Sequence, residues 1–237
     1  MTVSVQLFCL PFAGAGASFF RPWRKLGVAG VTVRPVQLPG RERLIDRAPY
    51  TDVGQAVEGL LPELSAPEDR PVALFGHSLG AVLAFELARR LQERGEPPVH
   101  LFVSGSPAPG LPRLQRATGL DDAAFLARVE KFAGYRHEVL DDPEMRALIL
   151  PALRADVAMH ESYRPGTDTP IDVPITALRG TDDTLVTDAE TAAWATATTG
   201  GFDRVDLPGG HMYLTEAGPA VVALVAAAVA VRALAGS

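Results

Sequence analysis

The chain reads VALFGHSLGAVLAFELARR from residue 72 to residue 90. Residues 72–75 form a short apolar run between a proline and a glycine, which is typical of a buried strand. Apolar residues then recur at every third or fourth position from Leu79 to Leu91, and this spacing predicts an amphipathic helix that Gly95 ends. The predicted strand and helix are joined by the pattern Gly-x-Ser-x-Gly, with Ser78 at its centre.

The turn around Ser78 has the context that a nucleophile elbow requires, because a strand leads into it and a helix leaves it. Such a turn strains the serine backbone, and Gly76 and Gly80 avoid side-chain clashes with the neighbouring elements. The start of the helix also favours negative charge that develops nearby. We therefore interpret Ser78 as a catalytic nucleophile; the alternative is an ordinary surface turn after a strand.

Strand-like and helix-like segments alternate along the rest of the chain. Further strands are predicted at residues 3–10, 31–37, 99–104, 175–179 and 204–207. Helices are predicted over residues 51–61, with Thr51 or Asp52 as N-cap and Pro62 near the end, and over the alanine-rich stretch that closes the chain. The alternation predicts an α/β fold that takes in residues 1–237 as one domain, with a mostly parallel central sheet and helices on both faces.

Residues 112–164 interrupt this alternation, since they contain no good strand. Helices are predicted at residues 121–132 and 144–159, and Pro151 should kink the second helix or split it in two. One side of that helix carries an apolar row made of Met145, Leu148, Ile149, Leu153 and Val157. We interpret residues 112–164 as a helical lid inserted into the α/β domain; the alternative is a pair of ordinary crossover helices.

A serine hydroxyl is a weak nucleophile until a base takes its proton. In hydrolases with this elbow the partners follow in the order Ser, then Asp or Glu, then His. His211 fits the base because it comes after the last predicted strand and a Pro-Gly-Gly turn. His77 is expected to point away from the nucleophile, and His100 lies within a predicted strand. His137 and His160 fall in the predicted lid.

The acid that orients His211 should also follow a strand, and two adjacent aspartates compete for this position. The spacing Gly180-x-x-Asp183-x-x-Val186 favours Asp183 as the acid, which would fix the histidine tautomer and stabilise the imidazolium. Asp182 is the alternative, although it fits better as a solvated aspartate that caps the next helix.

Two backbone N–H groups should stabilise the oxyanion of the reaction. One is expected from Leu79, directly after the nucleophile, and the other from Ala13 in the loop that follows the first strand. Gly14 and Gly16 in that loop loosely resemble a dinucleotide fingerprint. Phe19 stands where its third glycine should be, so we reject NAD or FAD binding.

Composition excludes several other classes of protein. The 237 residues carry a formal charge of −6, which gives no basic footprint for nucleic acid. A single cysteine, Cys9, excludes an internal disulfide framework and a cysteine-based metal site. The most apolar stretch, residues 217–231, is shorter than a membrane span of about 20 residues. We expect a cytoplasmic protein that binds neither nucleic acid nor membrane.

The motifs together resemble the type II thioesterases of polyketide and nonribosomal peptide synthesis, which are stand-alone enzymes of the α/β-hydrolase fold. The resemblance covers nearly the whole chain and includes its Pro-Gly-Arg segment, in which Arg43 comes one position earlier than the family's second arginine. Phe12 also differs, since many members have histidine there. The segments that carry the resemblance are residues 7–14, 36–43, 76–80, 153–156 with Glu161 and Tyr163, 180–186 and 209–211.

This resemblance implies removal of stalled or aberrant acyl groups from the phosphopantetheine arm of acyl or peptidyl carrier proteins. The carrier protein would be a transient partner of a monomeric enzyme that needs no metal and no cofactor of its own. Arg41 and Arg43 could contact the carrier, pair with acidic groups in the fold or form a solvated turn, and we place neither in the active site. The expected chamber for the acyl group is lined by Phe12, Met145, Leu148 and Ile149.

Two alternative hypotheses for the function stay open at this point. An acyl-coenzyme A thioesterase or a general carboxylesterase would use the same three side chains, although the Pro-Gly-Arg segment weighs against both. A non-catalytic binding module on a hydrolase fold is the second alternative, and the complete set of Ser78, Asp183 and His211 argues against it.

Overall fold

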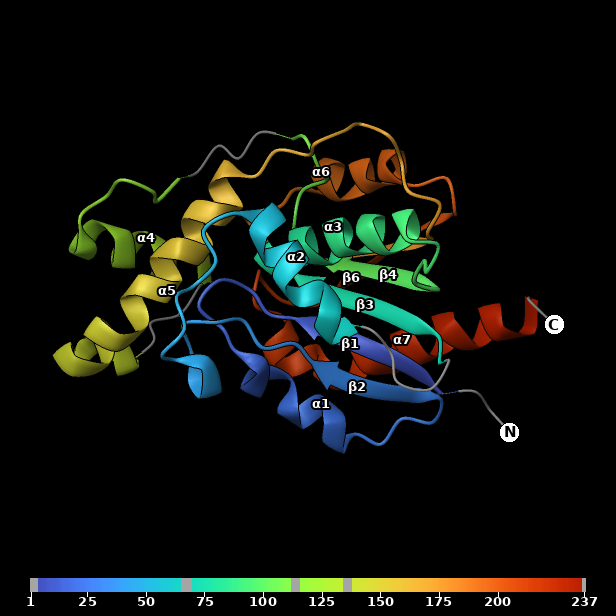
Figure 1. Cartoon of the computed structure of the whole chain (residues 1–237), viewed down its shortest axis with the longest axis horizontal. Helices are drawn as coiled ribbons and strands as arrows, with labels where there is room; N and C mark the ends of the chain where they lie inside the picture. Colours follow the sequence, from blue (N-terminus) through green and yellow to red (C-terminus); the bar gives the residue numbers. More distant parts are fainter. Residues whose placement is uncertain (1–3, 65–69, 112–115, 134–137, 236–237) are drawn as a thin grey trace.

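The computed structural model describes residues 4–64, 70–111, 116–133 and 138–235, and its centre is a parallel sheet of six strands. The strands lie side by side in the order β2-β1-β3-β4-β5-β6 (Figure 1). Their bounds are β1 Val5–Leu10, β2 Val31–Pro35, β3 Val72–His77, β4 His100–Ser104, β5 Ile175–Gly180 and β6 Phe202–Leu207. The predicted α/β class and parallel sheet are confirmed.

The longer helices cover both faces of this sheet or extend beyond its end. These longer helices are α2 (Val53–Leu64), α3 (Leu79–Glu93), α4 (Asp122–Ala133), α5 (Pro143–Ser162) and α7 (Leu214–Ala235). Two short helices are α1 (Arg21–Lys25) and α6 (Asp188–Ala192). Single 3-10 turns are η1 Ala17–Phe20, η2 Glu42–Leu44, η3 Glu138–Asp141 and η4 Ala193–Ala197.

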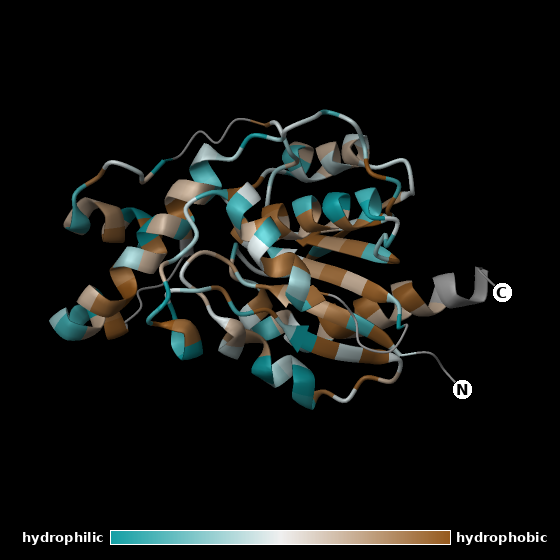
Figure 2. Ribbon diagram, viewed as in Figure 1, coloured by the Kyte–Doolittle hydropathy of each residue, from teal (hydrophilic) through white to brown (hydrophobic). Residues whose placement is uncertain are grey.

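Strand β1 shows why the sheet is covered on both sides. All six of its residues are buried, as expected for a central strand of a parallel sheet. Phe8 and Leu10 join the core beneath α2 and α3, whereas Leu7 and Cys9 join the opposite core with α1 and α7. Figure 2 shows the apolar strands enclosed between helices whose outer surfaces are more polar.

Between β4 and β5 the described residues form helices and no strand. Figure 1 shows α4 and α5 beyond the carboxyl ends of the strands. Helix α5 begins at Asp142, whose side chain accepts hydrogen bonds from the backbone N–H groups of Glu144 and Met145. The helix continues unbroken through Pro151, so the expected split into two helices is wrong.

The other predicted helices differ from the structure only near their ends. Asp52, not Thr51, provides the side-chain cap of α2, because its carboxylate accepts from the backbone N–H of Gln55 at 3.1 Å. Pro62 lies inside the last turn of this helix. Helix α7 packs into the core through Val221, Val222 and Val225. Searched over its described residues, the chain has no helix with the length and apolar character of a membrane span.

Candidate active site

Ser78 lies at the sharp turn between β3 and α3. Its backbone has φ 53° and ψ −113°, a left-handed conformation that side chains rarely adopt. The backbone N–H of Ser78 donates to the carbonyl of Ser104 at the end of β4, which ties the turn to the sheet. A non-glycine residue in this conformation, held by its neighbours, is the local geometry expected of a nucleophile elbow.

Two glycines make this turn sterically possible. A Cβ on Gly76 would lie 1.9 Å from the carbonyl oxygen of Gly80, and a Cβ on Gly80 would lie 2.3 Å from that of Leu10. Backbone atoms cannot move aside as a flexible side chain can. The Gly-x-Ser-x-Gly pattern is therefore required by the close approach of β1, β3 and α3.

We predict that Gly76→Ala destabilises the protein by about 3 kcal/mol, the upper end of the usual cost of overpacking. For a chain of this size the melting temperature should fall by roughly 6–12 °C. Thermal unfolding followed by circular dichroism measures this. Gly166→Ala is the matched control, because its added Cβ meets nothing within 4 Å. Equal melting temperatures for the two variants would contradict the steric argument.

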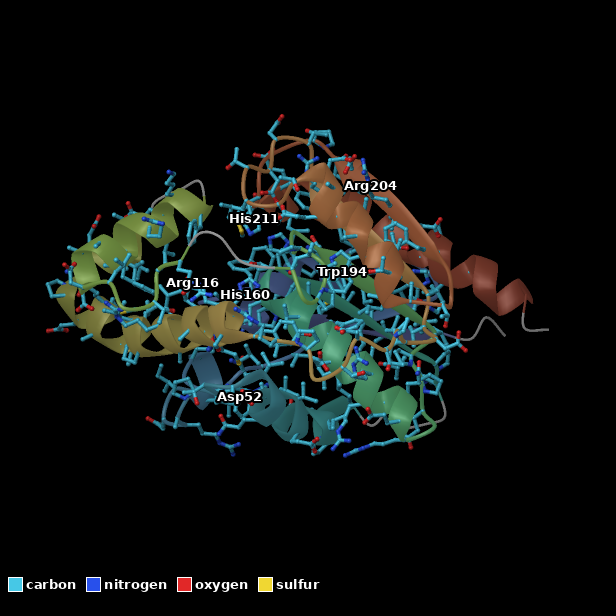
Figure 3. The ribbon with its side chains drawn as sticks, turned by 90° about the horizontal axis from the view of Figure 1, so that it is seen from above. Asp52, Arg116, His160, Trp194, Arg204 and His211 are labelled. Atoms are coloured by element: carbon cyan, nitrogen blue, oxygen red, sulfur yellow. The ribbon has the colours of Figure 1, made fainter. Side chains whose placement is uncertain are left out.

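His211 and Asp183 come from the loops after two neighbouring strands. Gly180 at the end of β5 is in register with Leu207 at the end of β6, so both loops leave the same edge of the sheet. His211 Nδ1 and Asp183 Oδ2 are 2.8 Å apart and form a hydrogen bond. Figure 3 labels His211 on the side of the sheet that faces α4 and α5.

The second oxygen of the Asp183 carboxylate is also occupied. It accepts from the backbone N–H groups of Leu185 at 2.8 Å and Val186 at 3.2 Å. Burial alone would raise the pKa of Asp183, but the hydrogen bond and charge of His211 and these two N–H groups lower it below its ordinary value. The carboxylate is therefore ionised and fixed in orientation, and it holds the proton of His211 on Nδ1.

Asp182, the alternative acid, does not reach His211 in this arrangement. Its side chain is exposed, and its backbone N–H donates to the carbonyl of Gly209. It does not cap the next helix either, because α6 begins with a capping box made by Thr187 and Glu190.

Ser78 and His211 line one cavity of about 830 Å³ with a mainly apolar wall. Among the described residues no hydrogen bond joins their side chains, so Nε2 of His211 has no partner. In unliganded sites such contacts are commonly loose and tighten when substrate binds. The four residues expected to form an acyl chamber all line this cavity: Phe12, Met145, Leu148 and Ile149.

These chamber residues differ in exposure. Met145 is 37% exposed and Leu148 is 51% exposed, whereas Ile149 is only partly accessible. Leu153 and Val157, further along α5, line the same cavity and are buried. The amino-terminal half of α5 therefore contributes the open rim of the cavity, and its carboxyl-terminal half contributes the closed end.

The loop after β1 brings Ala13 to the same cavity. Gly14 has φ +80°, and its N–H donates to Asp156 on α5 at 2.8 Å. The N–H of Ala15 donates to the carbonyl of Phe12. Within the described chain no group accepts from the N–H of Ala13 or of Leu79, which leaves both N–H groups available to a ligand.

His77 makes contacts that no local sequence pattern indicated. Its buried ring packs against His211, with the ring centres 4.8 Å apart. Its Nδ1 is hydrogen-bonded to Ser104 Oγ, which in turn is bonded to the hydroxyl of Tyr213. Burial, and then the neighbouring His211, lower the pKa of His77 well below its ordinary value, so this ring stays neutral beneath His211.

The remaining histidines have other surroundings. His100 is hydrogen-bonded to Thr176 and stacked on Phe102 within the sheet, as its strand position suggests. His160 lies on α5 and lines the cavity (Figure 3). His137 lies outside the described residues.

Arg41 lies in the Pro-Gly-Arg segment, and the alternative that this segment is a solvated turn is wrong for Arg41. It is buried and forms a two-pronged ion pair with Asp156, which is the internal pairing left open as an alternative. It also lines the cavity of Ser78, so the expectation that neither arginine lies in the active site is wrong for Arg41. Burial makes Arg41 unavailable to a docking protein, whereas Arg43 is exposed.

The described residues contain no group of three or more His, Cys, Asp or Glu side chains that could hold a metal ion. The arrangement offers instead a hydroxyl, a carboxylate-bound imidazole and two backbone donors around an apolar cavity. Such a set supports attack on an acyl carbonyl and stabilisation of the oxyanion that results.

Known proteins share this architecture. The Thioesterase domain family matches residues 5–228. The chain is 39% identical to gramicidin S biosynthesis protein GrsT of Aneurinibacillus migulanus, over 90% of this chain and 84% of that protein. It is 37% identical to thioesterase PikA5 of Streptomyces venezuelae, over 90% of this chain and 76% of that protein.

A solved structure agrees with these sequence relatives. The type II thioesterase BorB from the borrelidin biosynthetic cluster superimposes with a TM-score of 0.82 at 37% identity, over 94% of this chain and 90% of BorB. On the strength of these matches, the chain belongs to the thioesterase domain family of α/β-hydrolase fold enzymes.

Proposed function

We propose that this thioesterase hydrolyses acyl thioesters carried on the phosphopantetheine arm of acyl or peptidyl carrier proteins, with Ser78 as nucleophile. The observation that carries the proposal is the shared apolar cavity of Ser78 and His211, with Asp183 bonded to the far nitrogen of the histidine. The names of the relatives add support, because GrsT and BorB are assigned to gramicidin S and borrelidin biosynthesis.

The first half of the reaction transfers the acyl group to the enzyme. Ser78 Oγ attacks the thioester carbonyl carbon while His211 Nε2 takes the hydroxyl proton. The N–H groups of Ala13 and Leu79 stabilise the oxyanion of the tetrahedral intermediate. When this intermediate collapses, the carbon–sulfur bond breaks, His211 returns its proton to the departing thiolate, and the acyl group remains on Ser78.

The second half releases the acid. His211 takes a proton from a water molecule, whose oxygen attacks the acyl-serine carbonyl. Collapse of the second tetrahedral intermediate breaks the ester bond and returns the proton to Ser78 Oγ. Asp183 stabilises the imidazolium that forms in both halves. Protein groups and water supply every step, and the phosphopantetheine belongs to the substrate.

The test of the substrate class is a rate comparison between donors of one acyl group. A hexanoyl carrier protein, hexanoyl-coenzyme A and a hexanoyl oxygen ester carry the same acyl group and differ only in the leaving group. We expect kcat/KM to be at least about tenfold higher for the carrier protein, because docking adds binding energy beyond the arm. Equal values for the carrier protein and coenzyme A would favour the acyl-coenzyme A thioesterase, and a faster oxygen ester would favour the carboxylesterase.

A second prediction concerns acyl length. Leu148→Trp should fill the open rim and reduce turnover of hexanoyl groups more than of acetyl groups. Each buried methylene contributes about 0.8 kcal/mol, or roughly fourfold, so displacement of two methylenes changes the hexanoyl-to-acetyl ratio by about 15-fold. The ratio is measured on both carrier-bound substrates.

Leu26→Trp is the control for this experiment, since Leu26 is similarly exposed but does not line the cavity. Its ratio should equal that of the parent enzyme. Met145→Trp at the same rim is expected to behave as Leu148→Trp does. An unchanged ratio in both rim variants would mean that the acyl group takes another route.

A further inference from the structure

Asp156 on α5 joins three segments that are far apart in the sequence. Its carboxylate is 1% exposed. Oδ2 accepts from the backbone N–H of Gly14 at 2.8 Å and from Arg41 Nη1 at 2.5 Å. Oδ1 accepts from Arg41 Nη2 at 2.8 Å. Both oxygens are therefore occupied by charged or backbone donors, in the fork geometry that arginine favours.

The guanidinium of Arg41 extends this junction to the loop after β1. Its Nη1 also donates to the carbonyl of Ala15 at 3.1 Å, and its Nε donates to the carbonyl of Pro39 at 3.2 Å. The same ion pair thus holds an N–H at Gly14 and a carbonyl at Ala15. Peptide rotation in this short loop would break at least one of these bonds.

Packing against α5 supports the same contact. Gly14 has a left-handed φ, and a Cβ there would lie 2.8 Å from Leu153 Cδ1. Gly40 has φ +79°, and its Cβ would lie 3.3 Å from that of Ala152. The two glycines allow the loop and the Pro-Gly-Arg turn to approach the carboxyl-terminal half of α5 closely.

We propose that Asp156 and Arg41 are positioning residues for the oxyanion hole. They hold the Ala13–Gly14 peptide, and with it the adjoining Phe12–Ala13 peptide whose carbonyl accepts from Ala15, so that the Ala13 N–H stays directed at the reacting carbonyl. The inference rests on the proposed function, in which Ala13 supplies that donor. The N–H groups of Gly14 and Ala15 are engaged, so Ala13 is the residue of this triplet whose N–H remains for the substrate.

The effect should be confined to the charged tetrahedral state. An oxyanion-hole donor is worth about 10²–10³ in kcat, and a misplacement of about 1 Å can cost 10²-fold. Binding of the neutral thioester does not need the donor in this position. Loss of the ion pair should therefore lower kcat while KM changes little.

The experiment uses Asp156→Asn and hexanoyl-N-acetylcysteamine as substrate. We expect kcat to fall by roughly 10–100-fold with KM within threefold of the parent value. An alkyl trifluoromethyl ketone, which adds to the serine as an oxyanion, should bind more weakly by a similar factor. In the folded variant, a merely structural role would not lower kcat and inhibitor affinity together while KM stays constant.

Two further variants make the result decisive. Tyr163→Phe is the matched control, because its hydroxyl ties the end of α5 to Glu86 on α3 and Tyr163 does not line the cavity of Ser78. It should leave kcat and inhibitor affinity within twofold. Should Asp156→Asn fail to fold, the double variant Arg41→Met with Asp156→Leu, which leaves no buried charge unpaired, is measured in the same way.

The failures can be told apart. If the folded Asp156 variant or the double variant keeps kcat and inhibitor affinity within twofold of the parent, the positioning role is overturned. Ser78→Ala is assayed in parallel on the same substrate. Turnover by Ser78→Ala at the parent rate would overturn the proposed serine mechanism itself, whereas an inactive Ser78→Ala beside a fully active Asp156→Asn overturns only the inference about Asp156.

Discussion

Ser78→Ala is expected to reduce kcat on an acyl carrier protein by at least about 10⁴-fold, with the fold retained. The substitution removes the oxygen that we propose forms the acyl-enzyme, and in other serine hydrolases loss of the nucleophile costs up to about 10⁶. Residual catalysis of about 10³–10⁴ over water can remain from the oxyanion hole and binding. Single-turnover assays with mass spectrometry of the acyl-enzyme measure both consequences.

The control for this variant is Ser162→Ala. Ser162 is exposed at the end of α5, and its hydroxyl donates only to the carbonyl of Met159 within the same helix. It should keep the parent rate and form the acyl-enzyme normally. If Ser78→Ala still accumulated a covalent acyl group, the nucleophile would have to be another side chain.

Asp183→Asn should lose roughly 10⁴ in kcat, while Asp182→Asn stays within about twofold of the parent. The amide of asparagine would donate to His211 Nδ1 and leave the proton on Nε2, so the histidine could not accept the serine proton. Asp182 is exposed, and in the described structure its side chain makes no hydrogen bond to His211, so an amide there should change nothing at the ring.

The stability of Asp183→Asn, measured as a function of pH, shows how much of the effect comes from a weakened fold. The folded pKa of Asp183 is lowered, so its ionised form stabilises the folded state above its unfolded pKa, and that stabilisation is lost as pH falls through the lowered folded value. Asp183→Asn should therefore be less stable than the parent enzyme at neutral pH, and the two stabilities should converge at strongly acid pH.

If Asp182→Asn lost more activity than Asp183→Asn, Asp182 and not Asp183 would be the acid that orients His211.

The elements of the fold and the strand-end positions of the site were accessible from the sequence because both depend on local patterns. The short apolar strand before Ser78 and the periodic helix after it predict the turn between them. Asp183 and His211 each follow a strand, and adjacent parallel strands bring their carboxyl ends to one edge. The structure places both side chains in contact there.

Contacts between distant segments were not accessible in the same way. Arg41 and Asp156 are 115 positions apart, and nothing local to either residue distinguishes a buried partner from a solvated charge. The packing of His77 on His211 likewise depends on how β3 and the loop after β6 meet. The Arg41–Asp156 ion pair becomes evident only when the folded chain brings the two side chains together.

The expected split of α5 at Pro151 was wrong for a different reason, and the alternative of a kink there stays a prediction. A proline inside a helix frees the carbonyl of the residue four positions earlier, and the prediction of a split assumed that this loss decides the outcome. Pro151 and Ala147 both lie on the exposed side of α5, where solvent can satisfy the freed carbonyl. The buried side, with Leu150, Leu153 and Val157, keeps the helix in one piece.

The reactivity of Cys9 can report local unfolding of β1. It is the single cysteine of the chain, it is a buried residue of β1, and burial raises the pKa of its thiol well above the ordinary value. Only the thiolate reacts with iodoacetamide, so alkylation requires that the strand first leave the sheet. The alkylation rate therefore counts excursions of β1, the strand that carries the Ala13 loop, without any reference to turnover.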